Sequence, residues 1–324
     1  MRTPSAGITV PEGIRSGVRP LGNGARICGG IRPKALVVAA VVLAAGALAR
    51  AQPPPPAPAR PHIAGIAHVA IQTSDLAKAR AFYGDLLGFP EIGARRPHLA
   101  IFYVNDRQRL IIRDGLPPAR DERFIDVAYQ VNITAMRGHL AARGAQPTDA
   151  IADADAGGTR IQVTDPDGHA VQFVELTATG RGRAIAPDRR ISRRILHTGW
   201  TIRDSAAADR FYKDILGFSE TWRGGRPEGT ISWINMRVPD GTDYLEYMLY
   251  PAGPPDRRQL GSAHHVALLV TDIQEALETV RARTKPDDRN HRANPSIGVN
   301  NRWQLNLFDP DGTRVEFMEP WTVR

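Results

Sequence analysis

The stretch DPDGTRVEFME, from Asp309 to Glu319, places a carboxylate inside an apolar strand. A tight turn is followed by residues that alternate along a strand, and Glu316 stands in the middle of the apolar run. Removing a carboxylate from water is costly unless a partner compensates its charge. A second turn of the same kind, DPDGHAVQFVE, carries Gln172 where the first has Glu316. One copy of the motif therefore keeps a charge that the other lacks.

Three more residues of ligand type lie in strand-like runs of the second half. His197 lies in ILHTGW, Glu246 in DYLEYMLY and His265 in HHVALLV. Residues two apart in a strand share a face, so each of these side chains can point inward from its strand. Two imidazoles and two carboxylates facing inward suit one divalent ion of the first transition row. We therefore expect a nickel, cobalt, zinc, manganese or iron ion to be bound by His197, Glu246, His265 and Glu316.

A simpler reading exists for each residue taken alone. A single histidine near the start of a strand is usually a hydrogen-bonded structural residue. Glu316 could pair with Arg314 two positions before it, or with an arginine across the sheet. Four residues of ligand type at matching places are harder to explain in this way, and we therefore favour the metal site.

The elements that position these residues follow from an internal repeat. Residues 66–89, IAHVAIQTSDLAKARAFYGDLLGF, match residues 195–218, ILHTGWTIRDSAAADRFYKDILGF. Each copy has a histidine-led strand, an aspartate that can cap a helix, the pattern FY-x-D-x-LGF and a glycine that can end the helix. Three strand-like runs follow each helix, the first of them near Glu91 in the first copy. The repeating unit is therefore β-α-β-β-β.

Two further units of the same plan begin near residues 125 and 263, and each ends through a DPDG turn into its last strand. The sequence thus predicts an α+β fold of four βαβββ modules in two similar halves. Each half is expected to have open curved sheets around a cleft. We place the first domain at residues 64–178, a linker at 179–193 and the second domain at 194–320.

The repeat resembles the vicinal-oxygen-chelate superfamily, which includes glyoxalase I, extradiol ring-cleaving dioxygenases and bleomycin resistance proteins. The resemblance rests on the His-led first strand, the FY-x-D-x-LGF helix and the DPDG turn, and it covers about residues 64–320. It implies two tandem glyoxalase-like domains. It also implies that His197, Glu246, His265 and Glu316 occupy the metal-binding positions of glyoxalase I-like proteins.

The first half holds His68, Ile112, Asp126 and Gln172 at the corresponding places. Isoleucine cannot bind a metal ion, so this half is expected to be a degenerate copy kept for packing or for shaping a cleft. The pairing of the modules remains open at this point. Adjacent modules would unite the four second-half residues, which we favour, whereas exchanged modules would join His68 with His265 and Glu316.

The amino-terminal residues have the features of a signal peptide. Residues 1–51 contain seven arginine and lysine residues against Glu12 alone, which is +6 of the total formal charge of +8. A basic segment precedes the apolar run ALVVAAVVLAAGAL and an A-x-A cleavage site, so cleavage is expected between Ala51 and Gln52. Residues 52–63 form a proline-rich tether. The protein is therefore expected to be secreted or periplasmic, with no membrane association beyond this signal.

The remaining composition excludes several classes of protein. The remaining charge of +2 is too small for a nucleic-acid-binding surface, and no phosphate-binding loop is present. The single cysteine, Cys28, lies in the leader, which excludes disulfides and a cysteine nucleophile from the mature chain. The expected partner is a small-molecule substrate, which Asn300, Asn301 and Arg302 could hold if it is anionic. A monomer or a homodimer is equally consistent with the sequence.

The leading functional hypothesis is an exported metal-dependent isomerase or lyase. Its substrate would chelate the metal through two neighbouring oxygens, with Glu316 or Glu246 as the catalytic base and the metal stabilising an enediolate. One alternative is an Fe(II) or Mn(II) ring-cleaving dioxygenase, which needs only two histidines and one glutamate. Another is a non-catalytic protein that binds a small molecule, as related resistance proteins do.

Overall fold

A computed structural model of the chain describes residues 59–117, 123–153, 158–176, 188–250, 256, 260 and 263–323. The predicted signal peptide and most of the tether lie outside these residues, as does most of the predicted linker, and the domain limits stay predictions. Among the described residues, no helix is long and apolar enough to cross a membrane.

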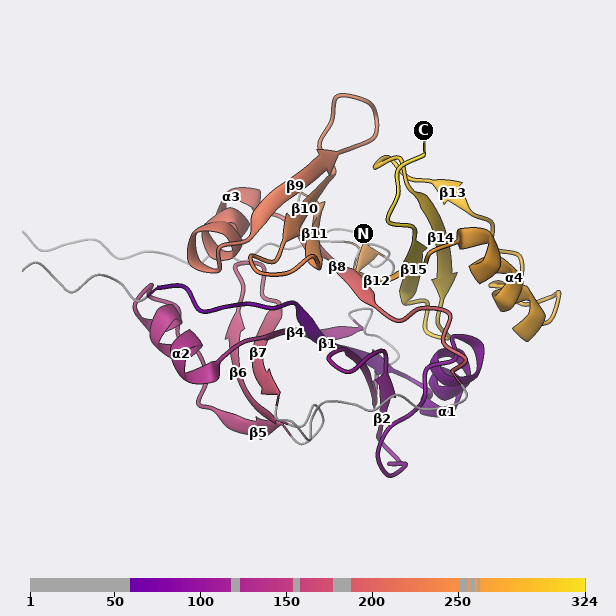
Figure 1. The fold of residues 1–324 in the computed structure, drawn as a ribbon, viewed down its shortest axis with the longest axis horizontal. Coiled ribbons are helices and arrows are strands. Elements are labelled where there is room, and N and C mark those ends of the chain that lie inside the picture. The colour runs from indigo at the N-terminus through magenta and orange to yellow at the C-terminus, as the bar shows by residue number, and fades with distance from the viewer. Residues whose placement is uncertain are drawn as a thin grey trace, which may run out of the picture. The chain divides into compact units, whose positions relative to one another are not determined.

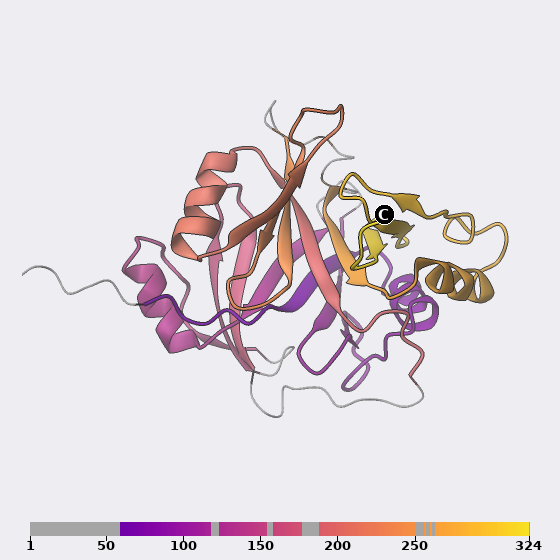
Figure 2. The same ribbon diagram turned by 45° about the horizontal axis from the view of Figure 1, so that its top comes forward.

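Two curved sheets, one from each half of the chain, form the fold (Figures 1 and 2). This arrangement confirms the predicted α+β architecture of two tandem glyoxalase-like units. In the first sheet the strand order is β2-β3-β1-β4-β7-β6-β5. Its strands are β1 (Ile66–Thr73), β2 (Leu99–Tyr103), β3 (Arg109–Asp114), β4 (Phe124–Gln130), β5 (Ile151–Asp153), β6 (Gly158–Thr164) and β7 (Ala170–Leu176).

The second sheet repeats this plan with the order β13-β14-β15-β12-β8-β11-β10-β9. Its strands are β8 (Ile195–Ile202), β9 (Ser219–Gly224), β10 (Trp233–Arg237), β11 (Tyr244–Leu249), β12 (His265–Leu269), β13 (Ser296–Ile297), β14 (Trp303–Phe308) and β15 (Arg314–Met318). In both sheets the histidine-led first strand pairs with the first strand of the next module in sequence, β1 with β4 and β8 with β12. The modules of each sheet are therefore adjacent in sequence.

One element of the first module differs from the prediction. The strand expected near Glu91 is only an isolated bridge between Glu91 and Phe102, whereas the second half has the full strand β9 at this place. A proline at position 90 and a glycine at position 93 explain the difference, because proline cannot donate a ladder hydrogen bond and glycine weakens a strand.

The helix of each repeat begins after its capping aspartate and ends before its glycine, as the sequence predicts, although its second part is π-helical. The helices are α1 (Leu76–Arg80) with the π-helical η1 (Ala81–Leu86), α2 (Ile133–Ala141), α3 (Ser205–Asp209) with the π-helical η2 (Arg210–Ile215), and α4 (Ile273–Arg283). Asp75 and Asp204 accept hydrogen bonds from the first turns of α1 and α3. Gly88 and Gly217 follow η1 and η2 with φ of 79° and 77°, the left-handed conformation that favours glycine.

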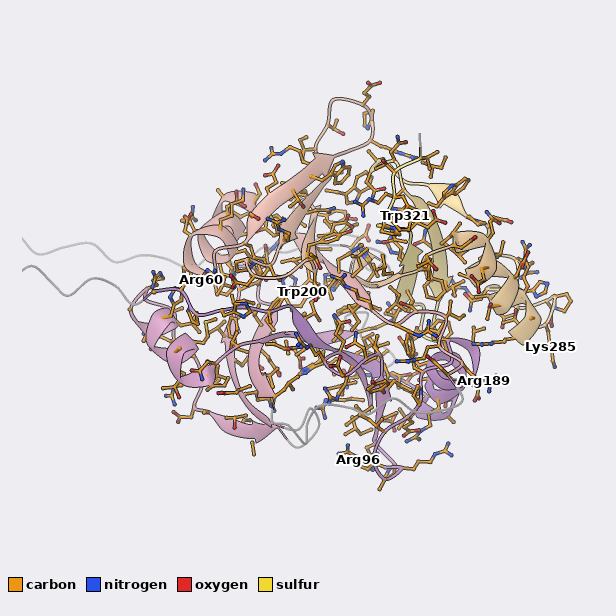
Figure 3. All side chains as sticks on the ribbon, viewed as in Figure 1. Arg60, Arg96, Arg189, Trp200, Lys285 and Trp321 are labelled. Carbon is orange, nitrogen blue, oxygen red and sulfur yellow. The ribbon has the colours of Figure 1, made fainter. Side chains whose placement is uncertain are left out.

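The two halves share one hydrophobic core. Tyr83, Tyr129 and Trp200 are fully buried in it, and Trp200 is labelled near the centre of the view in Figure 3. Two hydrogen bonds between the repeated motifs connect the halves, one in each direction. The tyrosine of the FY motif in the first half, Tyr83, donates a hydrogen bond to Asp309 in the DPDG turn of the second half at 3.1 Å. Tyr212 donates in turn to Asp165 at 3.0 Å.

Candidate metal centre

Four neighbouring strands of the second sheet carry the predicted ligands. In sheet order β15, β12, β8 and β11 they are Glu316, His265, His197 and Glu246. Neighbouring strands are about 4.8 Å apart, so the two outer strands of this set would be about 14 Å apart in a flat sheet. Both carboxylates nevertheless reach His197, Glu316 at 3.4 Å and Glu246 at 3.9 Å. The curl of the sheet therefore brings the four side chains to one point.

The centre of this concave face is a glycine. Gly199 of β8 lies opposite His265 on one side and opposite Glu246 on the other. A Cβ atom at Gly199 would lie only 2.0 Å from Cε1 and 2.2 Å from Nδ1 of His265. The absence of a side chain at this position is what allows the imidazole to lie over β8.

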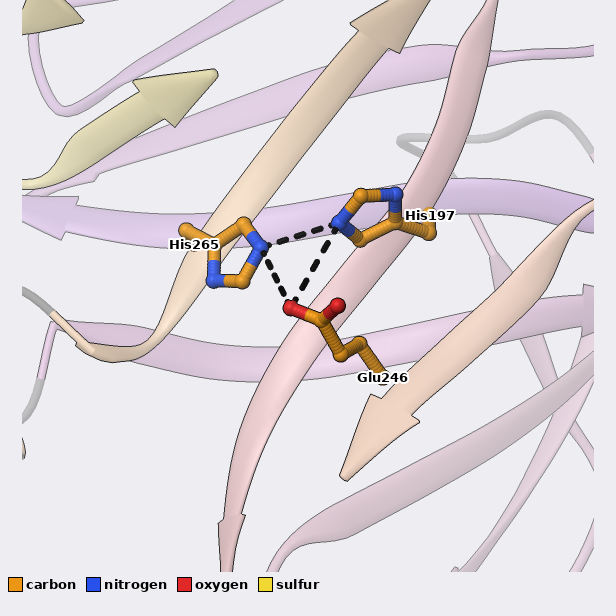
Figure 4. A group of neighbouring side chains, drawn as sticks. All are labelled: His197, Glu246 and His265. Atoms are coloured by element: carbon orange, nitrogen blue, oxygen red, sulfur yellow. Dashed lines mark hydrogen bonds and ion pairs between the residues drawn. The ribbon is translucent and has the colours of Figure 1, made fainter. Parts of the chain in front are cut away.

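The ligand atoms are close enough to share one ion (Figure 4). The Nε2 atoms of His197 and His265 are 2.9 Å apart, and Oε2 of Glu246 is 3.4 Å from Nε2 of His265. Oε2 of Glu316 lies 3.6 Å from Nε2 of His265. Two atoms that each bind the same ion at about 2.0–2.2 Å are about 2.9–3.5 Å apart at the angles usual for such sites. Three of the observed separations lie in this range, namely those of His197 from His265, of His265 from Glu246 and of His197 from Glu316. The separations of Glu316 from His265 and of Glu246 from His197, 3.6 Å and 3.9 Å, are slightly longer.

Neighbouring groups hold the two imidazoles in place. Nδ1 of His265 lies 2.8 Å from the carbonyl oxygen of Ala263 and 2.6 Å from a guanidinium nitrogen of Arg314, so contacts at Nδ1 hold the ring with Nε2 facing the cluster. The ring of Tyr244 stacks on His197 with centroids 4.4 Å apart and planes 23° apart. Both histidines are completely buried. The rings are thus oriented before any ion binds.

The charges of the cluster also favour a cation. Burial lowers the pKa of His265 well below its usual value, and the charge of Arg314 lowers it further, so this imidazole is neutral. Burial raises the pKa of Glu246, and Glu316 adds to the effect while His197 opposes it. Burial also acts to raise the pKa of Glu316, but a hydrogen bond from His197 and the charge of Arg314 outweigh it, and this pKa is lowered. A neutral imidazole and an ionised carboxylate are donors that a divalent transition metal binds.

A pocket of about 230 Å³ opens onto the cluster. Both carboxylates line it, together with Arg314 and the indole rings of Trp222 and Trp233. Asn300, which the sequence placed at the cleft mouth, also lines the pocket.

The two residues predicted beside Asn300 do not line the pocket. Asn301 instead donates a hydrogen bond to the carbonyl oxygen of Val323 at 3.1 Å, and Arg302 is absent from the described lining. The mouth therefore contains one of the three polar residues proposed for an anionic substrate.

In the first half, the side chains at the corresponding positions form hydrogen bonds with one another. Nε2 of His68 lies 3.0 Å from Asp126, and Gln172 donates to the other oxygen of Asp126 at 3.0 Å. The amide of Gln172 also donates to Gln162 at 3.2 Å. Asp126 is thus compensated by His68 and Gln172, so its carboxylate needs no ion, although Nδ1 of His68 is buried without a hydrogen-bond partner.

The structure corrects one position in the first half. The sequence comparison matched Ile112 with Glu246, but Ala70 of β1 pairs with Ile111 just as Gly199 pairs with Glu246. The true counterpart of Glu246 is therefore Ile111, one residue earlier. The sequence RLIIR gives no signal for this register, because both isoleucines are apolar and only the pairing decides which one faces the cleft.

The exchanged arrangement of modules is not what the structure shows. His68 lies in the first sheet with Asp126, whereas His265 and Glu316 lie in the second sheet with His197. Sequence reasoning missed Gly199. The available signal was a glycine in the middle of the strand-forming run ILHTGWTI, because glycine in a strand often marks a close approach.

Comparison with known proteins agrees with this fold. Residues 65–173 and 194–317 each match the family model described as the Glyoxalase/Bleomycin resistance protein/Dioxygenase superfamily. Lactoylglutathione lyase of Haemophilus influenzae is 31% identical over 126 residues, which is 39% of this chain and 91% of that protein.

Solved structures with the same fold come from two kinds of enzyme. The Mn(II)-bound glyoxalase of Novosphingobium aromaticivorans superposes with a TM-score of 0.61 at 19% identity, covering 80% of this chain and 83% of that one. A homoprotocatechuate 2,3-dioxygenase of Brevibacterium fuscum, in complex with 3,4-dihydroxyphenylacetate, gives 0.61 at 20% identity, covering 82% and 83%. At these identities the likeness shows the fold alone.

Proposed function

This chain belongs to the Glyoxalase/Bleomycin resistance protein/Dioxygenase superfamily, and from that premise we propose that it is a metal-dependent lyase or isomerase. Its substrate would be a small molecule that chelates the metal through two neighbouring oxygens. The observation that carries the proposal is the second carboxylate. Glu246 lies 3.9 Å from His197 and 3.4 Å from His265, and Glu316 lies 3.4 Å and 3.6 Å from the same two imidazoles, so the cluster offers two carboxylates beside its two histidines.

Each donor has a distinct task in this proposal. His197 and His265 are buried and fixed by their neighbours, so they would hold the ion permanently. When bound, the ion would act as a Lewis acid and stabilise negative charge that develops on a substrate oxygen. Glu246 and Glu316 both line the pocket, so either can take a proton from substrate carbon and return it to a neighbouring carbon.

Exchange of substrate protons in deuterated water tests this reaction. We expect the chain to catalyse exchange at the carbon next to the carbonyl of small hydroxy-ketones, and Glu246→Gln to reduce the rate by at least about a hundredfold through loss of the base or of the fourth donor. Gln172→Ala, at the first-half position that corresponds to Glu316, is the control and should leave the rate unchanged. Catalysis that survives Glu246→Gln and Glu316→Gln alike would refute the assignment of the base.

A ring-cleaving dioxygenase is the second candidate. His197, His265 and Glu316 alone make the two-histidine-one-carboxylate set of non-haem iron oxygenases, with Glu316 at 3.4 Å and 3.6 Å from the two imidazoles. In that case oxygen uptake with catechols should require these three residues and should tolerate Glu246→Gln. The same variant therefore separates the two functions. Metal binding without either activity would favour a protein that only binds its ligand.

We also propose that the protein is exported. The proposal rests on the basic segment, the apolar run and the cleavage site at Ala51–Gln52 in the sequence. An exported enzyme would meet hydroxy-carbonyl compounds other than the cytosolic glutathione adduct. The intact mass of the protein recovered from cell fractions tests this proposal. A mature chain beginning at Gln52 outside the cytoplasm is expected, and a full-length chain confined to the cytoplasm would contradict it.

A further inference from the structure

Each of the two carboxylates in the cluster lies beside an asparagine on the neighbouring strand. Asn235 of β10 is directly opposite Glu246 of β11, and Asn306 of β14 is directly opposite Glu316 of β15. Side chains of directly opposed residues lie on the same face of a sheet with their Cβ atoms about 4.5–5.5 Å apart. Both amides therefore lie on the concave face, within reach of the carboxylates.

Neither amide is explained by the contacts around it. The Oδ1 atoms of Asn235 and Asn306 are buried and have no hydrogen-bond partner. An unsatisfied buried polar group destabilises the fold, and an apolar side chain at the same place would avoid this cost. Two such groups at equivalent positions on opposite sides of one cluster point to a shared role.

The first half of the chain shows what happens to these positions when the cluster is absent. Opposite Ile111, the counterpart of Glu246, stands Ile101, so the amide and the carboxylate are replaced together. At the other position Gln162 is opposite Gln172, and these two amides bond to each other at 3.2 Å. That bond shows that side chains at these opposed positions do reach one another across the strands.

From this pattern we infer that Asn235 and Asn306 are positioning residues of the metal centre. With each amide turned over, so that its nitrogen takes the place of the unpaired oxygen, the nitrogen would donate a hydrogen bond to the carboxylate oxygen that does not bind the ion. These bonds would hold Glu246 and Glu316 in their binding orientation. Such outer partners are a regular part of metal sites and stabilise the bound state. The inference rests on the proposed metal-dependent function, because the amides have no such task without an ion.

Cobalt(II) affinity of leucine and glutamine variants tests this role. Leucine keeps the approximate size of asparagine but cannot donate a hydrogen bond, whereas glutamine keeps the amide. We expect Asn306→Leu and Asn235→Leu each to raise the Kd for cobalt(II) by 10- to 100-fold, the usual effect of losing an outer partner. Asn306→Gln should stay within about threefold of the wild type, since a glutamine reaches across at the matching place in the first half.

Two further measurements distinguish this role from a merely structural one. The melting temperature of the metal-free leucine variants should match or exceed that of the wild type, because a buried unsatisfied amide is lost. Gln162→Leu, the matched change in the first half, should leave cobalt(II) affinity unchanged.

The outcomes separate the inference from the function on which it rests. Leucine variants that bind cobalt(II) as tightly as the wild type, while His265→Ala loses binding, would overturn the inference and leave the metal centre intact. If His265→Ala also binds cobalt(II) as tightly as the wild type does, the proposed metal centre is wrong, and the inference that depends on it is wrong as well.

Discussion

Replacement of Gly199 by alanine should abolish tight metal binding without unfolding the protein. The new Cβ would stand 2.0 Å from Cε1 of His265, whereas carbon atoms in contact are about 3.5–4.0 Å apart. The ring would have to move by about 1.5 Å to restore an ordinary contact. That displacement is a large part of a metal–nitrogen bond of about 2.0–2.1 Å, so Nε2 of His265 would no longer reach the ion.

The size of the effect follows from the same reasoning. Loss of an outer hydrogen-bond partner already costs 10- to 100-fold in metal affinity, so displacement of a ligand should cost at least about a hundredfold, or about 2.7 kcal/mol. Displacing the buried ring should cost about 1–3 kcal/mol, and the advantage of alanine over glycine within a strand, about 0.5–1 kcal/mol, offsets part of it. The metal-free protein should therefore still fold. Competition with a coloured chelator for cobalt(II) measures the affinity, and thermal unfolding measures the stability.

Two controls make this prediction specific. Ala70 occupies the place of Gly199 in the first sheet, opposite Asp126 and Ile111, so Ala70→Gly should leave metal affinity unchanged. In a chain that already carries His265→Ala, Gly199→Ala should have little further effect on metal affinity, because the ring it displaces is absent. Wild-type cobalt(II) affinity in Gly199→Ala would refute the reasoning, since it would mean that His265 need not lie over β8.

Three further predictions concern the rest of the molecule. His68→Ala should leave metal content unchanged, because this residue bonds within the first sheet, and a loss of metal would argue for a site that spans both halves. Tyr83→Phe should lower the free energy of unfolding by about 1–2 kcal/mol, because it removes the hydrogen bond between the halves. Tyr129→Phe should cost nothing, because the hydroxyl of Tyr129 is buried without a partner. Equal effects of the two changes on unfolding in urea would contradict this reasoning. The hydrogen bond from Arg60 lowers the pKa of Asp240 from 3.8 to about 2, so the pair adds stability above pH 3.8 and loses it as the pH falls through about 2. Because both side chains are partly exposed, Asp240→Asn should cost at most about 1 kcal/mol at neutral pH and almost nothing near pH 2, and a cost that is constant with pH would exclude the ion pair as its cause.

Much of this fold can be predicted from local signals in the sequence. The helix caps at Asp75 and Asp204 and the glycine stops at Gly88 and Gly217 are local chemistry, and the structure confirms all four. The repeat made the plan of two halves visible, because each copy contains the same strand, helix and turn in the same order.

The candidate site was only partly accessible from the sequence. The four ligands could be predicted from residue type and from position in the repeat, because an ion is the simplest partner for a carboxylate buried between apolar neighbours. The contributions of Gly199, Asn235 and Asn306 depend on which residues lie opposite one another across strands. That register is set by pairing between distant segments, and the same limit explains why Ile112 was taken for the counterpart of Glu246.

The reciprocal bonds between the halves could not be predicted for a related reason. Tyr83 and Asp309 belong to motifs that the repeat marked, but their partnership joins opposite ends of the chain. Sequence alone showed that the motifs recur and gave no reason to pair the tyrosine of one half with the aspartate of the other.

Metal content of the purified protein tests the central claim most directly. The full chain would be prepared without chelators and without a histidine tag, reconstituted with each of five divalent ions in turn, and assayed by elemental analysis beside His197→Ala. We predict about one equivalent of a first-row transition metal per chain in the wild type and almost none in the variant. A wild-type chain that stays free of metal after reconstitution, or a variant that keeps a full equivalent, would contradict a metal centre built by His197, Glu246, His265 and Glu316.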